Sequence, residues 1–306
     1  MSSLIEKAAQ RLEQLRQAGV DVGAAALPGK SPPEPTPDAR TPCVPPSRVV
    51  TLDLAALLAQ GFVTPNAPRS AIADQFRIIK RPLLDNAMNK GAAVVQHGNL
   101  IMITSAMPAE GKSFSAVNLA MSIAMELDHT VLLVDADVAR PSLSKSLGLP
   151  SGPGLLDLLF DSSLDVAQAL LRTNVDKLSV LPSGTPHPRA TELLASDAMR
   201  ALVQEIGRRY ADRIVVFDSP PLLLTTEARA LAAHMGQIVL VVQAEKTLQS
   251  QVQHALSTIE ACPVKLLLLN QARTAGAQDA YGYGYGYGYG QESKPAATAA
   301  SAAVAL

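Results

Sequence analysis

Aromatic residues and cysteine are scarce in this chain of 306 residues, and tryptophan is absent. Aromatic residues make up 4% of the sequence, and the two cysteines, Cys43 and Cys262, lack the spacing of a metal or redox motif. This pattern disfavours a disulfide-stapled scaffold and is typical of a protein from a reducing compartment. A net charge of −1 gives no overall attraction to nucleic acid, so we expect no nucleic-acid partner.

Long apolar runs are also missing from the sequence. No stretch approaches the roughly 20 apolar residues that a helix needs to span a bilayer. The first residues, MSSLIEKAAQRLEQLRQ, carry charges throughout, unlike a secretion signal. We therefore expect a cytoplasmic protein, which would reach the inner face of the plasma membrane only through a partner.

The segments before residue 49 differ in composition from the rest of the chain. Leucine and alanine recur at helical spacing within residues 1–18, which predicts an amphipathic helix. Such a helix would dock on its own domain or bind a partner, and the sequence leaves both open. Residues 19–48 are rich in proline, which predicts an extended linker.

Two helices are predicted after the linker. The first covers about residues 53–60 and ends at Gly61, and the second begins at Ala71 with Ser70 as its N-cap. Pro82 is expected to kink or end the second helix, because proline lacks the N–H that the helical ladder requires.

Short apolar runs alternate with helical stretches from about residue 98 onward. The helical stretches cover residues 115–127, 191–210 and 246–261. The apolar runs have the length and composition of strands buried on both faces. Such alternation predicts an α/β domain over residues 49–272, with a mainly parallel sheet and helices on both faces. The predicted strands are 100–104, 131–135, 178–181, 213–218, 237–242 and 264–270.

A Walker A pattern, AMPAEGKS at residues 106–113, lies between a predicted strand and a predicted helix. That order suits phosphate binding, because backbone N–H groups of the loop and the helix N-terminus then face the anion. We expect Lys112 to neutralise the β- and γ-phosphates of ATP and the Ser113 hydroxyl to bind Mg²⁺. These features predict a P-loop NTPase. The other predicted nucleotide contacts are Ala109, Glu110, Gly111 and Phe114.

Three aspartates follow predicted strands. Asp135 and Asp137 end VLLVDAD, and Asp218 ends IVVFD. Ligands of open α/β sheets bind at the carboxyl ends of the strands, and carboxylate oxygens suit Mg²⁺. Capping of the following helices is the simpler explanation for such residues. Beside a phosphate loop we predict catalytic roles for Lys112 and all three aspartates, and metal binding by Ser113, Asp135 and Asp218.

The tail, residues 273–306, holds five of the six tyrosines in the run YGYGYGYGYG. Alternating glycine opposes a stable helix, and we expect the tail to be disordered when free. A low-complexity spacer is one interpretation. Attached to a nucleotide site, the tyrosines are instead predicted phosphoryl acceptors: Tyr281, Tyr283, Tyr285, Tyr287 and Tyr289.

In this order, the motifs resemble the cytoplasmic domain of the bacterial tyrosine kinases that control exopolysaccharide export. VLLVDADVARPSL resembles the family's Walker A′ motif and FDSPP its Walker B motif. GLLDLL, the LPSG segment and the tyrosine-rich tail also match. FRIIKRPLL is similar to the variant in tyrosine autokinases of exosortase-linked gene clusters.

The resemblance implies an autokinase that uses Mg²⁺-ATP to phosphorylate its own tail and so regulates exopolysaccharide polymerisation. It implies that Arg140 lies near the phosphates or a neighbouring subunit. It also implies a separate membrane activator of the chain-length determinant type, a cognate tyrosine phosphatase and a ring-shaped homo-oligomer. In the family a Glu-x-x-Arg-x-x-Arg helix mediates that ring, and Asp74, Arg77 and Lys80 stand in its place here.

Positioning ATPases of the MinD/ParA group share this kind of fold and are the alternative. They carry a second lysine early in the phosphate loop, where this chain has Met107. One further departure from the kinase pattern is Ala109, which replaces a usual glycine and tolerates fewer backbone conformations.

Overall fold

The computed structural model describes residues 48–91, 94–209 and 213–272. The predicted N-terminal helix, nearly all of the proline-rich linker and the tyrosine-rich tail lie outside these ranges, as does Cys43. The predictions for those segments, and the predicted domain boundaries, therefore stay predictions.

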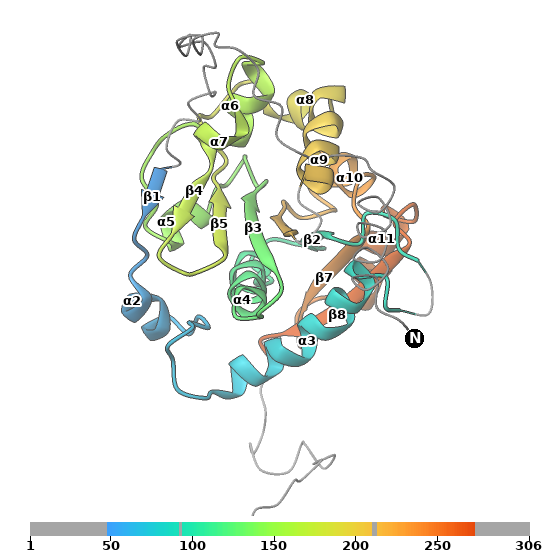
Figure 1. Ribbon diagram of the computed structural model, residues 1–306. Helices are drawn as coiled ribbons and strands as arrows, with labels where there is room; N and C mark the ends of the chain where they lie inside the picture. The colour runs from blue at the N-terminus through green and yellow to red at the C-terminus, as the bar shows by residue number, and fades with distance from the viewer. Residues whose placement is uncertain (1–47, 92–93, 210–212, 273–306) are drawn as a thin grey trace, which may run out of the picture. The chain divides into compact units, whose positions relative to one another are not determined.

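A mainly parallel sheet runs through the described part of the chain (Figure 1). Its strand order is β1-β4-β5-β3-β6-β2-β7-β8, and only β4 and β5 pair antiparallel. The central strands β3, β6, β2 and β7 are all parallel to one another. Their carboxyl ends therefore meet at one edge of the sheet. The strands are β1 (Arg48–Val50), β2 (Leu100–Ser105), β3 (Thr130–Asp135), β4 (Leu171–Thr173), β5 (Leu178–Leu181), β6 (Arg213–Asp218), β7 (Gln237–Gln243) and β8 (Val264–Asn270).

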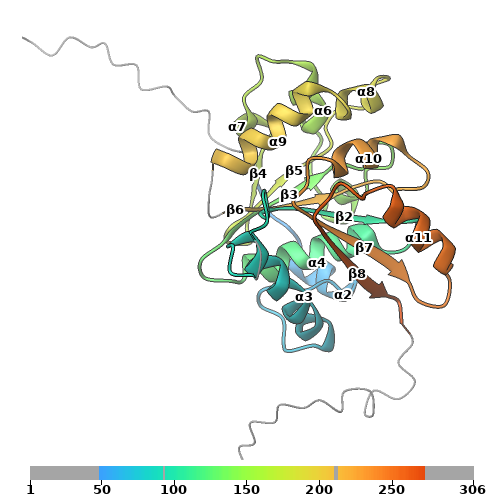
Figure 2. The same cartoon turned by 90° about the vertical axis from the view of Figure 1, so that its right-hand side faces the viewer.

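Helices cover both faces of the sheet (Figure 2). One face packs against α2 (Leu54–Ala59), α3 (Ala71–Ala87), α4 (Lys112–Ala124) and α5 (Leu143–Ser146). The described helices include none that is long and apolar enough to cross a bilayer. The other face packs against α6 (Leu155–Phe160), α7 (Val166–Ala169), α8 (Ala190–Leu194), α9 (Asp197–Arg209), α10 (Thr226–Ala232) and α11 (Gln249–Ser257).

Side chains of the central strands alternate between these two cores. In β2, Leu100 and Met102 join the core under α9 and α10, whereas Ile101 and Ile103 join the core under α4. Because both faces are buried, the strand interiors are apolar and polar residues are kept to the strand ends; each fully buried Leu or Ile contributes about 1.5–3 kcal/mol. The α/β architecture predicted from the alternating runs is confirmed.

All six predicted strands are present, but β1 and β4 were not predicted. Each has three residues, which is too short for a periodic signal. The predicted helix over 191–210 is two helices, α8 and α9. Ser196 separates them, and its hydroxyl accepts a hydrogen bond from the Met199 N–H at 3.3 Å, as serine does at helix starts.

Pro82 does not end α3, which continues to Ala87. Leu83 and Leu84, which follow the proline, are buried against the sheet. Pro82 itself is exposed. Ile78, whose carbonyl loses its helical partner, is 67% exposed, so water can reach that part of the helix. The predicted start of this helix is confirmed, because the Ser70 hydroxyl accepts from the Ala73 N–H at 3.3 Å.

Lys80 is a buried cation on the inner side of α3, with 3% of its surface exposed. Its ammonium group donates to the Ser122 carbonyl of α4 at 2.5 Å and pairs with Glu126 at 2.7 Å. Arg81 pairs with the same carboxylate at 3.0 Å. Burial lowers the pKa of Lys80, and the hydrogen bond and charge of Glu126 oppose that shift. Lys80 therefore ties α3 to α4.

Replacement of Lys80 by alanine is expected to destabilise the fold by about 2 kcal/mol, because Glu126 and the Ser122 carbonyl lose a buried partner. Arg77 is exposed, and among the described residues it forms an ion pair only with the exposed Asp74 one turn away, so it supplies the control. Arg77→Ala should change stability by no more than about 0.5 kcal/mol. Urea unfolding of both variants measures the difference, and equal values for the two would contradict the role of Lys80.

Candidate active site

The predicted phosphate loop lies between β2 and α4, at the carboxyl edge of the sheet. Gly111 ends the loop with φ of 92°, a left-handed conformation that favours glycine. A Cβ atom at this position would lie 2.0 Å from the Asn270 side-chain nitrogen. Gly111 is thus required by its backbone angle and by the approach of β8.

The loop is held in shape by Glu110, whose side chain is 2% exposed. One carboxylate oxygen accepts from the Met107 N–H at 2.8 Å, and the other accepts from the Thr247 hydroxyl. The predicted nucleotide contact by Glu110 is therefore possible only through its backbone. Ala109 precedes it with φ of 65°, in the region where a Cβ atom is disfavoured.

Helix α4 begins at Lys112, directly after the loop. Its first N–H groups have no partner within the helix and carry the positive end of the helix dipole. The backbone N–H groups of Ser113 and Phe114 belong to this set. The Phe114 ring packs on Phe62 with centroids 5.1 Å apart, so its predicted role in nucleotide binding falls to the backbone.

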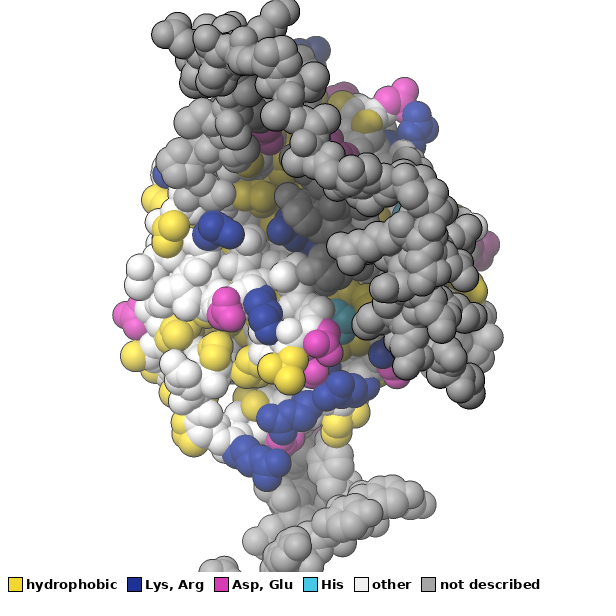
Figure 3. Space-filling view, viewed as in Figure 1, with side chains coloured by type: hydrophobic (Ala, Val, Ile, Leu, Met, Phe, Trp, Pro, Cys, Tyr) yellow, Lys and Arg dark blue, Asp and Glu magenta, His cyan; other side chains and the backbone are white. Residues whose placement is uncertain are grey.

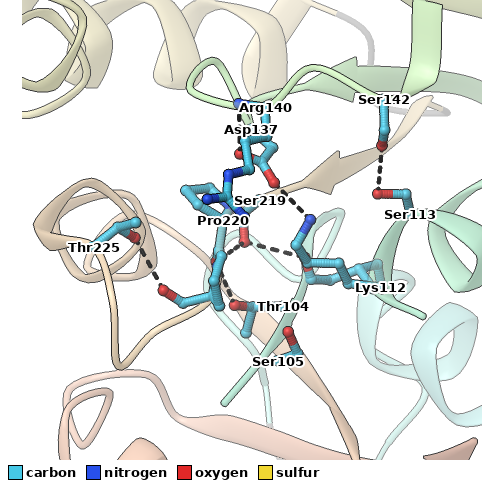
Figure 4. A network of polar contacts seen from close by, with 12 residues as sticks. Thr104, Ser105, Lys112, Ser113, Asp137, Arg140, Ser142, Ser219, Pro220 and Thr225 are labelled. Carbon is cyan, nitrogen blue, oxygen red and sulfur yellow. Dashed lines mark hydrogen bonds and ion pairs between the residues drawn. The ribbon is translucent and has the colours of Figure 1, made fainter. Parts of the chain in front are cut away.

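Lys112 and Asp137 face each other across the site (Figure 4). The Lys112 ammonium group donates to an Asp137 carboxylate oxygen at 2.6 Å, and both side chains are largely buried. The other Asp137 oxygen lies 3.3 Å from the Arg140 N–H. Asp137 thus forms an ion pair with Lys112, the cation that would attract an incoming phosphate.

Asp135 and Asp218 are register partners on the adjacent strands β3 and β6. Both are fully buried, and none of their four carboxylate oxygens makes a hydrogen bond of standard geometry among the described residues. Weaker donor contacts lower both pKa values in part: the Ser113 hydroxyl acts on Asp218, and the backbone N–H groups of Asp137 and Leu143 act on Asp135. Burial, reinforced by the charges of Asp218 and Asp137, raises the pKa of Asp135 to about 8. Burial raises the pKa of Asp218 to about 6, with Lys112 acting in the opposite direction. Two adjacent buried carboxylates whose donors are too few or too poorly placed to offset burial form a site that a cation would satisfy.

The groups around this pair fit Mg²⁺. Ser113 lies at the start of α4, and its hydroxyl accepts a hydrogen bond from the Ser142 hydroxyl at 2.8 Å (Figure 4). The described residues contain no cluster of three or more His, Cys, Asp or Glu side chains able to hold a metal by themselves. In nucleotide sites Mg²⁺ is bound through one or two carboxylates, substrate phosphates and water.

The segment after β6 is hydrogen-bonded to β2. The Thr104 hydroxyl donates to the Pro220 carbonyl at 2.9 Å, and the Ser219 hydroxyl donates to the Ile103 carbonyl at 3.1 Å. Figure 4 shows Thr104 and Ser219 on the same side of Lys112. These bonds fix Asp218 relative to the loop.

Arg140 is exposed at the rim of the site. Its backbone N–H donates to the Asp137 carbonyl at 3.1 Å. Its guanidinium group has no ion pair within the described part of the chain. This arrangement is compatible with the predicted approach to phosphates or a neighbouring subunit, which stays a prediction.

Asn270 and Gln271 are contacts that the sequence analysis missed. The Asn270 amide donates to the Glu110 carbonyl at 3.0 Å, and the Gln271 amide donates to the Ala109 carbonyl at 3.4 Å. Both residues follow the apolar run of β8, so they share the strand-end position that singled out the aspartates. The end of β8 thus supports the phosphate loop.

The raised carboxylate pKa values predict how stability depends on pH. In the unfolded chain these groups ionise near the ordinary value of 3.8, whereas the folded protein keeps Asp135 protonated to about pH 8. Folding then takes up protons, so the contribution of the pair to stability falls as pH rises from about 4 to about 8.

Replacing Asp135 by asparagine removes that dependence. Without nucleotide and with EDTA present, Asp135→Asn is expected to raise the melting temperature at pH 8 by about 3 °C or more, and to change it less at pH 5. Differential scanning calorimetry at both pH values measures this. The exposed Asp85 supplies the control substitution, Asp85→Asn. If Asp135→Asn had the same melting temperature at pH 8 as the wild type, the buried Asp135 carboxylate would not destabilise the fold, and the prediction would be refuted.

Comparison with known proteins identifies the family. No family model matches the chain. Among curated proteins, it is 33% identical over 210 residues to the tyrosine-protein kinase YwqD of Bacillus subtilis (strain 168), covering 69% of this chain and 84% of the relative.

Solved structures give the same result. The chimerical protein CapA2B2 matches with a TM-score of 0.57 and 29% identity over 73% of this chain and 93% of its own. The kinase domain of the Escherichia coli tyrosine kinase ETK matches with a TM-score of 0.56 and 25% identity, covering 76% of this chain and 97% of that domain. With a third of the residues identical over most of a relative's length, on this fold and around this phosphate loop, the chain belongs to the bacterial tyrosine-protein kinases.

Proposed function

We propose that this protein binds Mg²⁺-ATP and transfers the γ-phosphoryl group to the tyrosines of its own tail. The observation that carries the proposal is the buried pair Asp135 and Asp218, unsatisfied beside Lys112 and the start of α4. Such a pair needs a cation, and the helix start needs an anion. A magnesium-bound polyphosphate supplies both.

Each group has a distinct role in this proposal. When bound, Mg²⁺ would neutralise charge on the phosphates, held by Ser113, Asp218 and Asp135. Lys112 would exchange Asp137 for the β- and γ-phosphate oxygens. The backbone N–H groups from Gly111 to Phe114 would surround the phosphates. Phosphoryl transfer depends mainly on such positioning and charge neutralisation.

The acceptor chemistry is simple. The phenolic oxygen of a tyrosine forms the new bond to the γ-phosphorus, the bond to the bridging oxygen breaks, and ADP leaves. The phenolic proton passes to the carboxylate of Asp135 or of Asp137. A free tyrosine has a pKa near 10, so its proton leaves late in the transfer. The tail's five tyrosines, 281 to 289, are the proposed acceptors.

We also propose that tail phosphorylation regulates exopolysaccharide polymerisation or export, through a separate membrane activator and reversal by a tyrosine phosphatase. Each phosphate adds about −1.5 to −2 charge, so a modified tail repels its neighbours. The proposed location is the cytoplasmic face of the plasma membrane.

Assembly into a ring would rest on α3 in a modified form. Figure 3 shows basic side chains gathered over α3, with acidic ones among them. Arg77 and Arg81 keep 45% and 58% of their side chains exposed. Lys80 is buried against α4, so it is unavailable to a second subunit. We propose that Asp74, Arg77 and Arg81 are the polar contacts of any ring.

Intact-mass spectrometry after incubation with Mg²⁺-ATP tests the proposed kinase reaction. We expect several additions of phosphate, all in the peptide that contains residues 281–289. Lys112→Met should slow the reaction at least about 100-fold, since the variant loses a charged phosphate contact. A variant with all five tail tyrosines changed to phenylalanine should hydrolyse ATP but gain no tail phosphate.

The contrary result is an unmodified tail in a wild-type protein that hydrolyses ATP even with a membrane activator added. That outcome would favour a positioning ATPase. The phosphate loop gives that alternative no support, because Met107 occupies the place of its second lysine and packs against the core.

A further inference from the structure

A groove with a volume of about 420 Å³ lies beside the phosphate site. Two segments line it, residues 141–152 after β3 and residues 182–186 after β5. Four prolines give its walls a rigid apolar surface, and Lys145 is the one charged residue that lines it. The prolines are Pro141, Pro150, Pro182 and Pro186.

Hydrogen bonds hold the second segment of the groove against residues 154–157, which follow the first segment. One Asp157 carboxylate oxygen accepts from the Gly154 N–H at 2.8 Å and from the Thr185 N–H at 2.9 Å. The Leu155 N–H donates to the Pro182 carbonyl at 2.8 Å. A Cβ atom on Gly154 would lie 2.2 Å from that carbonyl oxygen. The groove is therefore a built part of the fold.

The position of the groove suits the binding of a phosphoryl acceptor. Ser142, next to the groove residue Pro141, donates to the Ser113 hydroxyl at 2.8 Å. The groove lies beyond β3, on the side of the carboxylates away from β7 and β8. A γ-phosphoryl group held near Asp135 and Asp218 would have its leaving ADP toward β2 and β7. In-line transfer then requires the attacking oxygen to come from the groove side.

We propose that this groove binds the Tyr-Gly repeat, residues 281–290, and presents one tyrosine at a time to the phosphate site. The inference deepens the proposed kinase function and rests on it. Proline faces are apolar surfaces on which a phenol ring can pack. Glycine on either side of each tyrosine lets the backbone approach the walls closely.

Charge favours the same occupant. Lys145 is exposed and has no ion pair within the described ranges. Arg48 lies at the rim, where its guanidinium donates to the Ser151 carbonyl at 3.3 Å. These cations complement phosphates already added to neighbouring tyrosines of the repeat.

The length of the tail allows the contact. The strand order places β5 five spacings from β8, which is about 24 Å at about 4.8 Å per spacing. Tyr281 lies nine residues after Ala272, and nine residue steps reach about 30 Å when fully extended. Tyr281 thus reaches the groove only with little slack, and the later tyrosines reach it more easily.

Photo-cross-linking tests the groove without depending on catalysis. The probe is a synthetic peptide of residues 277–291 in which the tyrosine at 285 is replaced by benzoylphenylalanine, added to the full chain with Mg²⁺-ADP. We expect adducts on residues 141–152 or 182–186, located by peptide mass spectrometry. Adducts confined to other surfaces, such as the exposed leucines of β8, would overturn the proposal.

Kinetics with the unmodified peptide give a second readout. Lys145→Ala and the groove-blocking Thr185→Trp should each raise the KM for the peptide about five- to tenfold, with KM for ATP unchanged. Lys90→Ala, which removes an exposed lysine near the amino ends of the strands, is the matched control and should behave as the wild type. An unchanged peptide KM in both groove variants would refute the assignment.

The two proposals fail separately. If the wild type phosphorylates the peptide and the groove variants do so equally well, only the groove is wrong. If the peptide cross-links to the groove but no tyrosine is ever phosphorylated, the kinase reaction is wrong and the binding site stands.

Discussion

The pair Asp135 and Asp218 is the constraint around which the site is arranged. Parallel pairing of β3 and β6 places the two carboxylates side by side at a buried strand end. Neither makes a hydrogen bond of standard geometry among the described residues, and the net cost of burial shows in their raised pKa values. Fully packed strands on both faces keep the pair in place, since neither strand can move without opening both cores. The fold thus stabilises an arrangement that is unfavourable without a cation.

The rest of the site balances charge around that pair. Lys112 rests on Asp137 and is thereby held close to the place where a phosphate would enter. Glu110, Asn270 and Thr247 fix the loop backbone, so its N–H groups are oriented before any ligand arrives. Such preorganisation lowers the reorganisation needed at the moment of phosphoryl transfer. Asn270 and Gln271, which precede the tail in the sequence, are hydrogen-bonded to the phosphate loop.

Local patterns predicted most of the central fold. Continuous apolar runs bounded β5, β6 and β8 at the observed residues, because strands whose interiors are apolar stand out from the polar segments around them. This holds even for the edge strand β8, where Leu267 and Leu269 are exposed. Patterns were incomplete where tertiary packing decided the outcome. Of the two outcomes expected at Pro82, a kink or an end of the helix, the end does not occur, since burial of Leu83 and Leu84 outweighs one lost hydrogen bond. The strands β1 and β4 could not be predicted from the sequence, because each has only three residues and so shows no periodicity. The resemblance placed Lys80 in the motif for ring assembly, whereas the structure buries it against α4.

The sequence by itself determined the chemistry. It specified a phosphate loop between strand and helix, strand-end carboxylates and a tail with five tyrosines, because these depend on residue type and local order. The tertiary structure alone decided which groups meet. Pairing of β3 with β6 made one site of Asp135 and Asp218, the end of β8 became a support for the loop, and two proline-bearing segments 30 or more residues apart became walls of one groove. Contacts between residues distant in the chain follow from strand order and packing, which no local pattern encodes.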